Sequence, residues 1–274
     1  MLGAYIGDIV GSVYEWHNIH TKEFPLFTAG SRFTDDSVMT CAVANVLARY
    51  KENGLPYDEL SAAFAEEMRS LGNKYPDRGY GSKFKMWLIN PEAGPYNSLG
   101  NGSAMRVSAA GWYGETLAET EDLAKISAAV SHNHPSGIKG AQAIAVAVFM
   151  ARNKFTKVAI NEYIEKKFYK LDFTIDGIRP TYKGLITCDG SVPEALEVFL
   201  EGRDFEDTIR LAISLGGDSD TIAAMAGAIA EAYYGVPEAI AQQAMPYLAP
   251  EMLGSIERLK IGIMCKTDVR GFII

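Results

Sequence analysis

The chain has 274 residues, of which 48% are hydrophobic, enough for one large domain or two small ones. Its net charge of −8, without any run of Lys or Arg, argues against nucleic acid as a partner. No apolar run reaches the roughly 20 residues of a membrane helix, and the first residues do not resemble a signal peptide, so no membrane partner is expected. Cys41, Cys188 and Cys265 are far apart without a CxxC pair, a pattern that fits a reduced, cytoplasmic setting.

The first predicted element covers residues 3–16, which are small and apolar with glycines at positions 3, 7 and 11. This spacing by four predicts that another helix approaches closely along one face. The segment contains two acids. Asp8 is interpreted as a cap or a buried hydrogen-bond acceptor, and Glu15 leads into a loop that contains histidines, where it either reaches a ligand or is solvated.

Thr34, Asp35 and Asp36 directly precede an apolar helix predicted over residues 38–50. Two adjacent acids at a helix start are favoured by the helix dipole, which is the simpler interpretation. If the pair is buried, however, the carboxylates repel each other unless a cation or hydrogen-bond donors lie between them. The cluster is therefore also a candidate metal site.

The middle of the chain predicts an amphipathic helix over 57–71 and a mostly irregular stretch over 72–98 with a short helix near 83–88. The Gly-Asn-Gly sequence at 100–102 then enters a predicted helix over 104–113. Its backbone N–H groups could bind a phosphate, although a plain turn is the alternative. Neither a P-loop nor a GxGxxG motif occurs.

Two further helices are predicted at 120–130 and 138–151, with the sequence SHNHP between them. His134 either caps the second helix or donates to a phosphate or ribose. Histidines two residues apart, without other soft ligands, argue against zinc. Residues 161–171 form another predicted helix, and 172–187 are expected to be a strand or extended segment.

Near the C-terminus, two glycines lead into Asp218, Ser219, Asp220 and Thr221, which open an alanine-rich helix. Capping requires one such side chain, so the surplus oxygens suit a hard divalent cation. Together with the cluster at 34–36, they offer oxygens for two metal ions. Helices are also predicted at 192–200, 204–215, 237–245 and 253–265. About a dozen helices with almost no period-2 alternation predict a single all-α domain over 1–274.

Five motifs together resemble the ADP-ribosylglycohydrolase family: GDIVGSVYE (7–15), FTDDS (33–37), GNGSAMR (100–106), SHNHP (131–135) and GGDSDTIAAMAGAIAEAYYG (216–235). The resemblance covers nearly the whole chain. It implies a compact all-α fold with a binuclear Mg2+ or Mn2+ centre. It also implies hydrolysis of the bond between C1″ of ADP-ribose and an acceptor. The partner is then an ADP-ribosylated protein, modified on arginine or serine, or a small ADP-ribosyl conjugate.

The resemblance also implies roles for individual positions. The implied metal ligands are Thr34, Asp35, Asp36, Asp218, Asp220 and Thr221. The implied lining of the ADP-ribose cleft is Asn101, Gly102, Ser103, His134, Ser136, Gly137 and Ile138. Asp36 or Asp218 is expected to take a proton from the attacking water, and Glu15 to assist the leaving group. The chain departs from the family at Ser37, where Thr is commoner, and in a shorter turn after His134. No motif aligns over 152–190, where acceptor specificity is expected.

Two other classes of function remain as alternatives. One is a different magnesium-dependent all-α phosphohydrolase acting on nucleotides, against which the acidic pair reads DDSVM rather than DDxxD and no His-Asp dipeptide occurs. The other is a non-catalytic ADP-ribose-binding relative, against which all six implied ligand positions carry oxygen side chains. The chain is expected to be a monomer or a small homo-oligomer.

Overall fold

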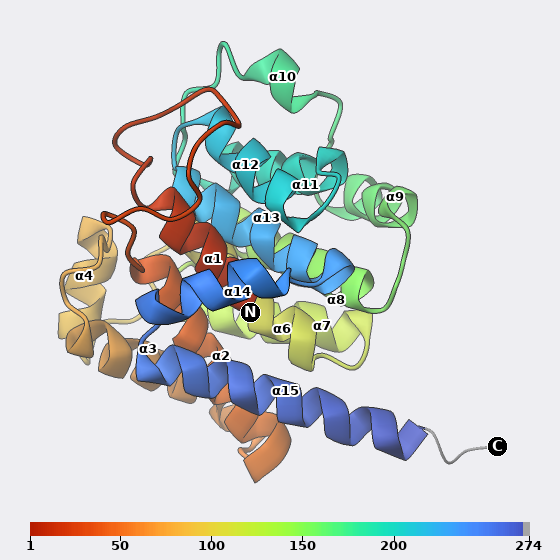
Figure 1. The fold of residues 1–274 in the computed structure, drawn as a ribbon. Coiled ribbons are helices and arrows are strands. Elements are labelled where there is room, and N and C mark those ends of the chain that lie inside the picture. The colour runs from red at the N-terminus through yellow and green to blue at the C-terminus, as the bar shows by residue number, and fades with distance from the viewer. Residues whose placement is uncertain (271–274) are drawn as a thin grey trace.

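The computed structural model describes residues 1–270, with side chains described for residues 1–260. This part of the chain folds into fifteen α-helices and contains no β-strand, which confirms the predicted all-α class. The last four residues of the predicted single domain lie outside the described residues. The helices, shown in Figure 1, are α1 (Leu2–Gly11), α2 (Asp35–Asn53), α3 (Leu60–Lys74), α4 (Ser82–Ile89), α5 (Gly102–Met105), α6 (Ser108–Tyr113), α7 (Leu117–Ala129), α8 (Pro135–Arg152), α9 (Lys157–Lys167), α10 (Ile175–Ile178), α11 (Val192–Glu201), α12 (Phe205–Leu215), α13 (Ser219–Tyr234), α14 (Glu238–Ala244) and α15 (Pro250–Arg270).

The centre of the fold is the contact between α1 and α13, which come from opposite ends of the chain (Figure 1). A Cβ atom added to Gly3 would lie 2.2 Å from the Gly227 carbonyl oxygen, and one added to Gly7 would lie 2.1 Å from that of Ala223. A Cβ on Gly11 would lie 2.3 Å from the Cα atom of Asp220. Only glycine allows the two backbones to come this close to each other. The close approach predicted from the spacing of the glycines is therefore confirmed.

The other helices surround this pair in two groups. Helix α13 also packs on α8, α11 and α12, while α2 packs on α3, α6 and α15. Figure 1 shows α15 running along the outside of α2. Alanine, isoleucine and methionine side chains of α13 are almost fully buried against the neighbouring helices. The packing therefore brings the start of α2 to the start of α13.

The prediction of one continuous helix over 104–113 is wrong. The chain forms two short helices instead, α5 and α6, which are separated by Arg106 and Val107. The Arg106 side chain is fully buried and donates hydrogen bonds to the Ser127 carbonyl at 2.8 Å and to Ser131 Oγ at 3.0 Å. The break coincides with this buried cation, whose hydrogen bonds hold the chain to the end of α7.

Of the two alternatives for 172–187, a strand or an extended segment, the structure rules out the strand. The segment contains the short helix α10 and is otherwise irregular, with a single isolated antiparallel bridge between Gly100 and Thr187. Its extended end pairs with the Gly-Asn-Gly loop rather than with a sheet, because no strand in the described residues offers a partner edge.

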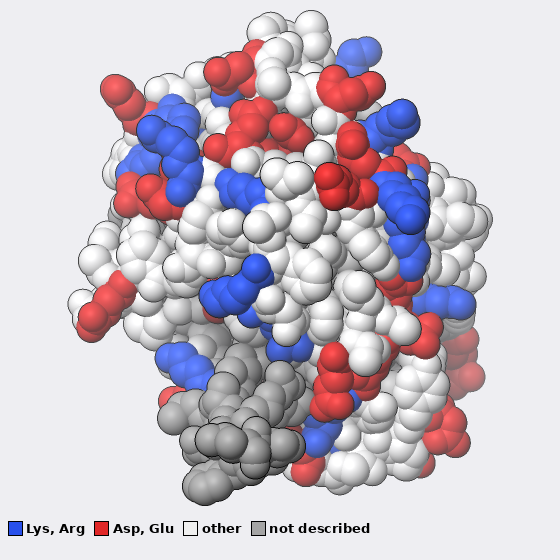
Figure 2. All heavy atoms as spheres, turned by 90° about the vertical axis from the view of Figure 1, so that its right-hand side faces the viewer, with Lys and Arg blue, Asp and Glu red and all other residues white. Residues whose placement is uncertain are grey.

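Within the described residues, no helix is both long and apolar enough to cross a membrane. On the face shown in Figure 2, lysine and arginine side chains are scattered among aspartate and glutamate. Among the described side chains, that face shows no continuous basic patch of the kind that binds a phosphate backbone.

Candidate active site

The two acidic clusters predicted from the sequence meet at the starts of α2 and α13. Thr34 is the N-cap of α2, and its Oγ1 accepts a hydrogen bond from the Asp36 N–H at 3.3 Å. Thr221, in the first turn of α13, donates from Oγ1 to Asp36 Oδ2 at 3.2 Å. This bond joins residues that are 185 positions apart in the sequence. The structure therefore brings together the two sets of oxygen side chains.

Asp8 is the buried hydrogen-bond acceptor that one interpretation of the sequence predicted. Its carboxylate accepts from the Thr34 N–H at 2.9 Å, from Thr34 Oγ1 at 2.7 Å and from the Ser37 N–H at 3.0 Å, and it is also bonded by Ser37 Oγ. The side chain is fully buried. Because all these partners lie at the start of α2, Asp8 fixes that helix start against α1.

Glu15 joins the second cluster. Each of Glu15, Asp218 and Asp220 offers a carboxylate oxygen, and the three oxygens lie within 4.8 Å of one another. The turn after α1 places Glu15 here, because its N–H donates to the Gly11 carbonyl at 3.2 Å and Gly11 itself lies against Asp220. Asp218 occupies the N-cap position of α13, but its side chain accepts no capping hydrogen bond from that helix.

These acids raise one another's pKa. Burial raises the pKa of Asp36 well above its ordinary value, and the charge of Asp220 raises it further. Burial and the charge of Asp218 do the same to the pKa of Asp220, and burial followed by the charge of Asp8 raises the pKa of Asp35. No acid of the cluster takes part in any ion pair of residues 1–260. Buried carboxylates without a counter-charge are costly.

The side chains fit a divalent cation. Asp36 Oδ1 is buried and has no hydrogen-bond partner in the described residues, although Oδ2 of the same carboxylate is bonded. Carboxylate and hydroxyl oxygens are the ligands that Mg2+ and Mn2+ prefer. A cation beside Asp36 and the Glu15–Asp218–Asp220 group would satisfy the unpaired oxygen and reduce the repulsion.

The Gly-Asn-Gly loop lies directly beside this cluster. Asn101 Nδ2 donates to Asp218 Oδ2 at 2.6 Å, and the Asn101 N–H donates to the Ile186 carbonyl at 3.0 Å. On the other side of the Gly100–Thr187 bridge, the Cys188 N–H donates to the Leu99 carbonyl at 3.0 Å. The loop therefore orients Asp218 and is itself supported by residues 186–188.

The remaining predicted cleft residues differ in what their side chains do. His134 is the N-cap of α8, since its Nδ1 accepts the Ser136 N–H at 3.1 Å and its carbonyl accepts the Ile138 N–H at 3.1 Å. Capping was one of the two interpretations, and it leaves the proton of the neutral ring on Nε2. Ser103 is fully buried and donates to the Gly137 carbonyl at 2.8 Å, so it joins the two loops instead of presenting its hydroxyl to a ligand.

His132 also belongs to this region, although no feature of the sequence singles it out. It is buried, which lowers its pKa well below the ordinary value, and its Nδ1 lies 2.8 Å from Ser131 Oγ. Its Nε2 points at the loop, because a Cβ atom on Gly102 would lie 2.9 Å from it. The SHNHP motif contained both histidines, but no signal in the sequence shows which ring faces the loop.

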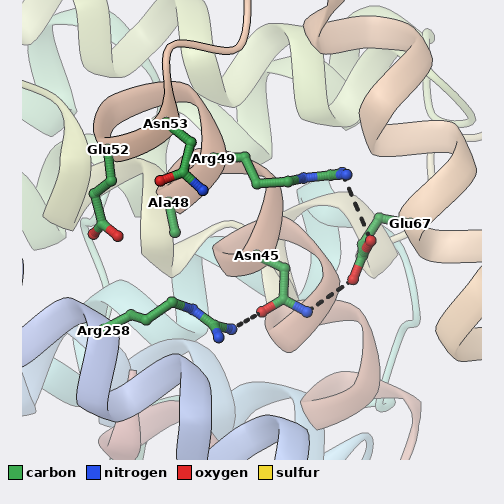
Figure 3. Close-up of a pocket in the computed structure, with 7 residues that line it drawn as sticks. All are labelled: Asn45, Ala48, Arg49, Glu52, Asn53, Glu67 and Arg258. Carbon is green, nitrogen blue, oxygen red and sulfur yellow. Dashed lines mark hydrogen bonds and ion pairs between the residues drawn. The ribbon is translucent and has the colours of Figure 1, made fainter.

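A pocket of about 260 Å3 lies elsewhere, between α2, α3 and α15 (Figure 3). Asn45 donates to Glu67 at 2.8 Å and accepts from Arg258, and Arg49 lies 3.6 Å from Glu67. Four of the lining residues, Asn45, Arg49, Glu67 and Arg258, thus contact one another, and none of the acidic cluster lines the pocket. We interpret it as a network that ties three helices together.

Comparison with known proteins agrees with this arrangement. The sequence profile of the ADP-ribosylglycohydrolase family matches residues 1–260. ADP-ribosylhydrolase ARH3 of Homo sapiens is 30% identical over 92% of this chain and 90% of its own length. ADP-ribosylarginine hydrolase Tri1 of Pseudomonas putida (strain GB-1) is 25% identical over 86% of this chain and 70% of its own length.

A solved structure described as an ADP-ribosylglycohydrolase-related protein complex has the same fold. It is 24% identical, covers 94% of this chain and 95% of its own, and has a TM-score of 0.68. The family profile matches almost the whole chain, and the sequence identity to ARH3 extends over most of both proteins. The chain therefore belongs to the ADP-ribosylglycohydrolase family.

Proposed function

We propose that this protein hydrolyses the bond between C1″ of ADP-ribose and an acceptor, with two divalent cations, Mg2+ or Mn2+, as cofactors. The observation that carries the proposal is the meeting of the two helix starts, in which Thr221 bonds Asp36 and the Glu15–Asp218–Asp220 group lies alongside. Family membership supports the choice of ADP-ribose as the group removed.

The cations would be held by Thr34, Asp35, Asp36, Asp218, Asp220 and Thr221. When bound, they would lower the pKa of the attacking water and coordinate the ribose hydroxyls. Asp218 is the better placed of the two candidate bases, because it is partly exposed and is oriented by Asn101, whereas Asp36 is buried. Glu15, whose pKa is raised by burial and by the charge of Asp218, can hold a proton for the leaving group.

The diphosphate would lie over the Gly-Asn-Gly loop. His134 supports this placement, since its Nε2 carries a proton that can be donated to a phosphate oxygen. The helix that follows the loop, α5, has only four residues, so the proposal relies on the backbone of the loop and not on a helix dipole. Gly102 leaves the room beside His132 that a larger residue would fill.

The experiment is a panel of arginine-, serine- and nucleobase-linked ADP-ribose substrates, with Mg2+ or Mn2+. Release of free ADP-ribose from at least one of them, abolished in Asp220→Ala, is the expected result. Release of inorganic phosphate from a nucleotide would instead favour the phosphohydrolase alternative. Binding of ADP-ribose in calorimetry, without turnover of any conjugate, would favour a non-catalytic relative.

A further inference from the structure

Trp16 is the most exposed large hydrophobic side chain of the described residues, with 78% of its surface accessible. It directly follows Glu15, whose carboxylate lies with Asp218 and Asp220. None of the aromatic pairs or cation–π contacts of residues 1–260 includes this indole. A large aromatic surface next to the acid cluster is therefore free to contact a ligand.

The backbone on both sides of Trp16 is held in place. The Glu15 N–H donates to the Gly11 carbonyl, and the His17 N–H donates to the Tyr14 carbonyl at 3.2 Å. Asn18 donates to the Glu15 carbonyl at 3.0 Å and accepts from the Gly217 N–H. These bonds join the turn to α1 and to the loop before α13. Trp16 therefore projects from a fixed turn and loses little backbone freedom when a ligand binds.

The position of this turn relative to the Gly-Asn-Gly loop indicates which part of a substrate it meets. Asp218 is bonded by Asn101 of the loop and lies beside Glu15 of the turn. With the diphosphate over the loop, the C1″ atom and the acceptor attached to it lie toward Glu15. This step rests on the proposed function.

We propose that the face of the Trp16 indole forms the acceptor subsite and selects a guanidinium, the planar cation of an arginine side chain, over a neutral acceptor. An indole face attracts cations through its quadrupole and stacks on planar groups, and a guanidinium offers both.

Trp16 also contacts the acid cluster directly, because its side chain interacts with the Glu15 carboxylate. The indole therefore lies at the edge of the group formed by Glu15, Asp218 and Asp220.

The test measures binding of L-argininamide and of L-citrullinamide, which replaces the guanidinium by a neutral urea, to the metal-loaded protein by calorimetry. In Trp16→Ala, we expect the affinity for argininamide to fall about fivefold and that for citrullinamide to stay unchanged. Trp16→Phe keeps a ring and should retain most of the affinity. Tyr57→Ala, at another exposed aromatic, should behave as wild type. The affinity for ADP-ribose should be the same in all four proteins.

An unchanged affinity for argininamide in Trp16→Ala overturns the proposal, and so does an equal loss for both amides, because charge selection is then absent. A loss of ADP-ribose affinity would show that Trp16 supports the whole site and not the acceptor. Since these titrations need no turnover, they separate this inference from the proposed function, which fails only if no conjugate releases ADP-ribose.

Discussion

Thr221 Oγ1 donates a hydrogen bond to Asp36 Oδ2 at 3.2 Å, and this one contact connects the start of α13 to the start of α2. The other oxygen of Asp36 is buried without a partner. The pair shows why the acids of this site cannot be explained by helix capping alone. A cap satisfies backbone N–H groups of its own helix, whereas Thr221 and Asp36 satisfy each other and leave an oxygen for a ligand.

Replacing Thr221 by valine should lower kcat/KM about tenfold or more, because it removes both a predicted ligand and the donor to Asp36 without changing the side-chain shape. The measurement is release of ADP-ribose at a fixed Mn2+ concentration. Thr208→Val is the matched control, since Thr208 is equally buried but donates to the Asp204 carbonyl at 2.7 Å, within α12 and its cap. Equal losses in the two variants would contradict a role for Thr221 in the site.

Removing the Asn101 amide in Asn101→Ala should reduce kcat/KM about tenfold while leaving the melting temperature nearly unchanged. The amide orients Asp218 through the 2.6 Å bond, so its loss frees the carboxylate from one of its constraints. Asn53→Ala, at an exposed residue ending α2, serves as the control and should leave activity intact. Full activity in Asn101→Ala would show that Asp218 needs no such support.

The contact between α1 and α13 should tolerate no side chain at Gly7. Gly7→Ala places a Cβ atom 2.1 Å from the Ala223 carbonyl oxygen, so the free energy of unfolding in urea should fall by about 3 kcal/mol. Gly94→Ala is the control, because Gly94 lies in a loop, a Cβ there meets nothing within 4 Å and its φ lies outside the left-handed region. It should change stability by less than about 0.5 kcal/mol. Similar stabilities of the two variants would mean that the helices can separate without cost.

Glu197 should make stability depend on pH. Burial and the charge and hydrogen bonding of Glu201 raise its pKa from 4.5 to about 7. A carboxyl group whose pKa is raised by folding stabilises the protein below its ordinary pKa and loses that contribution as the pH rises through about 7. Glu197→Gln should therefore add about 1 kcal/mol of stability at pH 8, after allowance for solvent screening, and almost none at pH 5.

Urea unfolding at pH 5 and pH 8 measures this effect. The exposed Glu66 provides the control variant Glu66→Gln, which should change stability little at either pH. A pH dependence in Glu197→Gln as steep as that of wild type would show that the carboxyl titrates normally.

Most of the helices could be predicted from the sequence, because hydrophobic periodicity and capping residues lie within the helix itself or next to it. Glycines every fourth residue indicated the close contact of α1, and the acid clusters marked the starts of α2 and α13 as helix caps do. The predicted helix over 104–113 failed because its break accompanies the burial of Arg106, which depends on contacts with α7.

The candidate site was predictable only in part. Residue types and spacing identified two oxygen-rich clusters, but only the resemblance to a family implied that they meet across 185 positions. The choice of His134 over His132 had no local basis, since ring orientation follows from tertiary packing. The support of the Gly-Asn-Gly loop by residues 186–188 was missed because it consists of backbone bonds, which no side-chain pattern encodes.

In the proposed function, the two helix starts jointly bind the divalent cations needed for hydrolysis. The most direct measurement is ADP-ribose release from a modified substrate by wild type, Asp36→Asn and Asp220→Asn, before and after a chelator and after Mn2+ is returned. We expect wild type to lose activity with the chelator and regain it with Mn2+, and both variants to stay inactive throughout. Unchanged release by chelated wild type, or wild-type rates in either variant, would show that hydrolysis does not depend on cations held by these two helix starts.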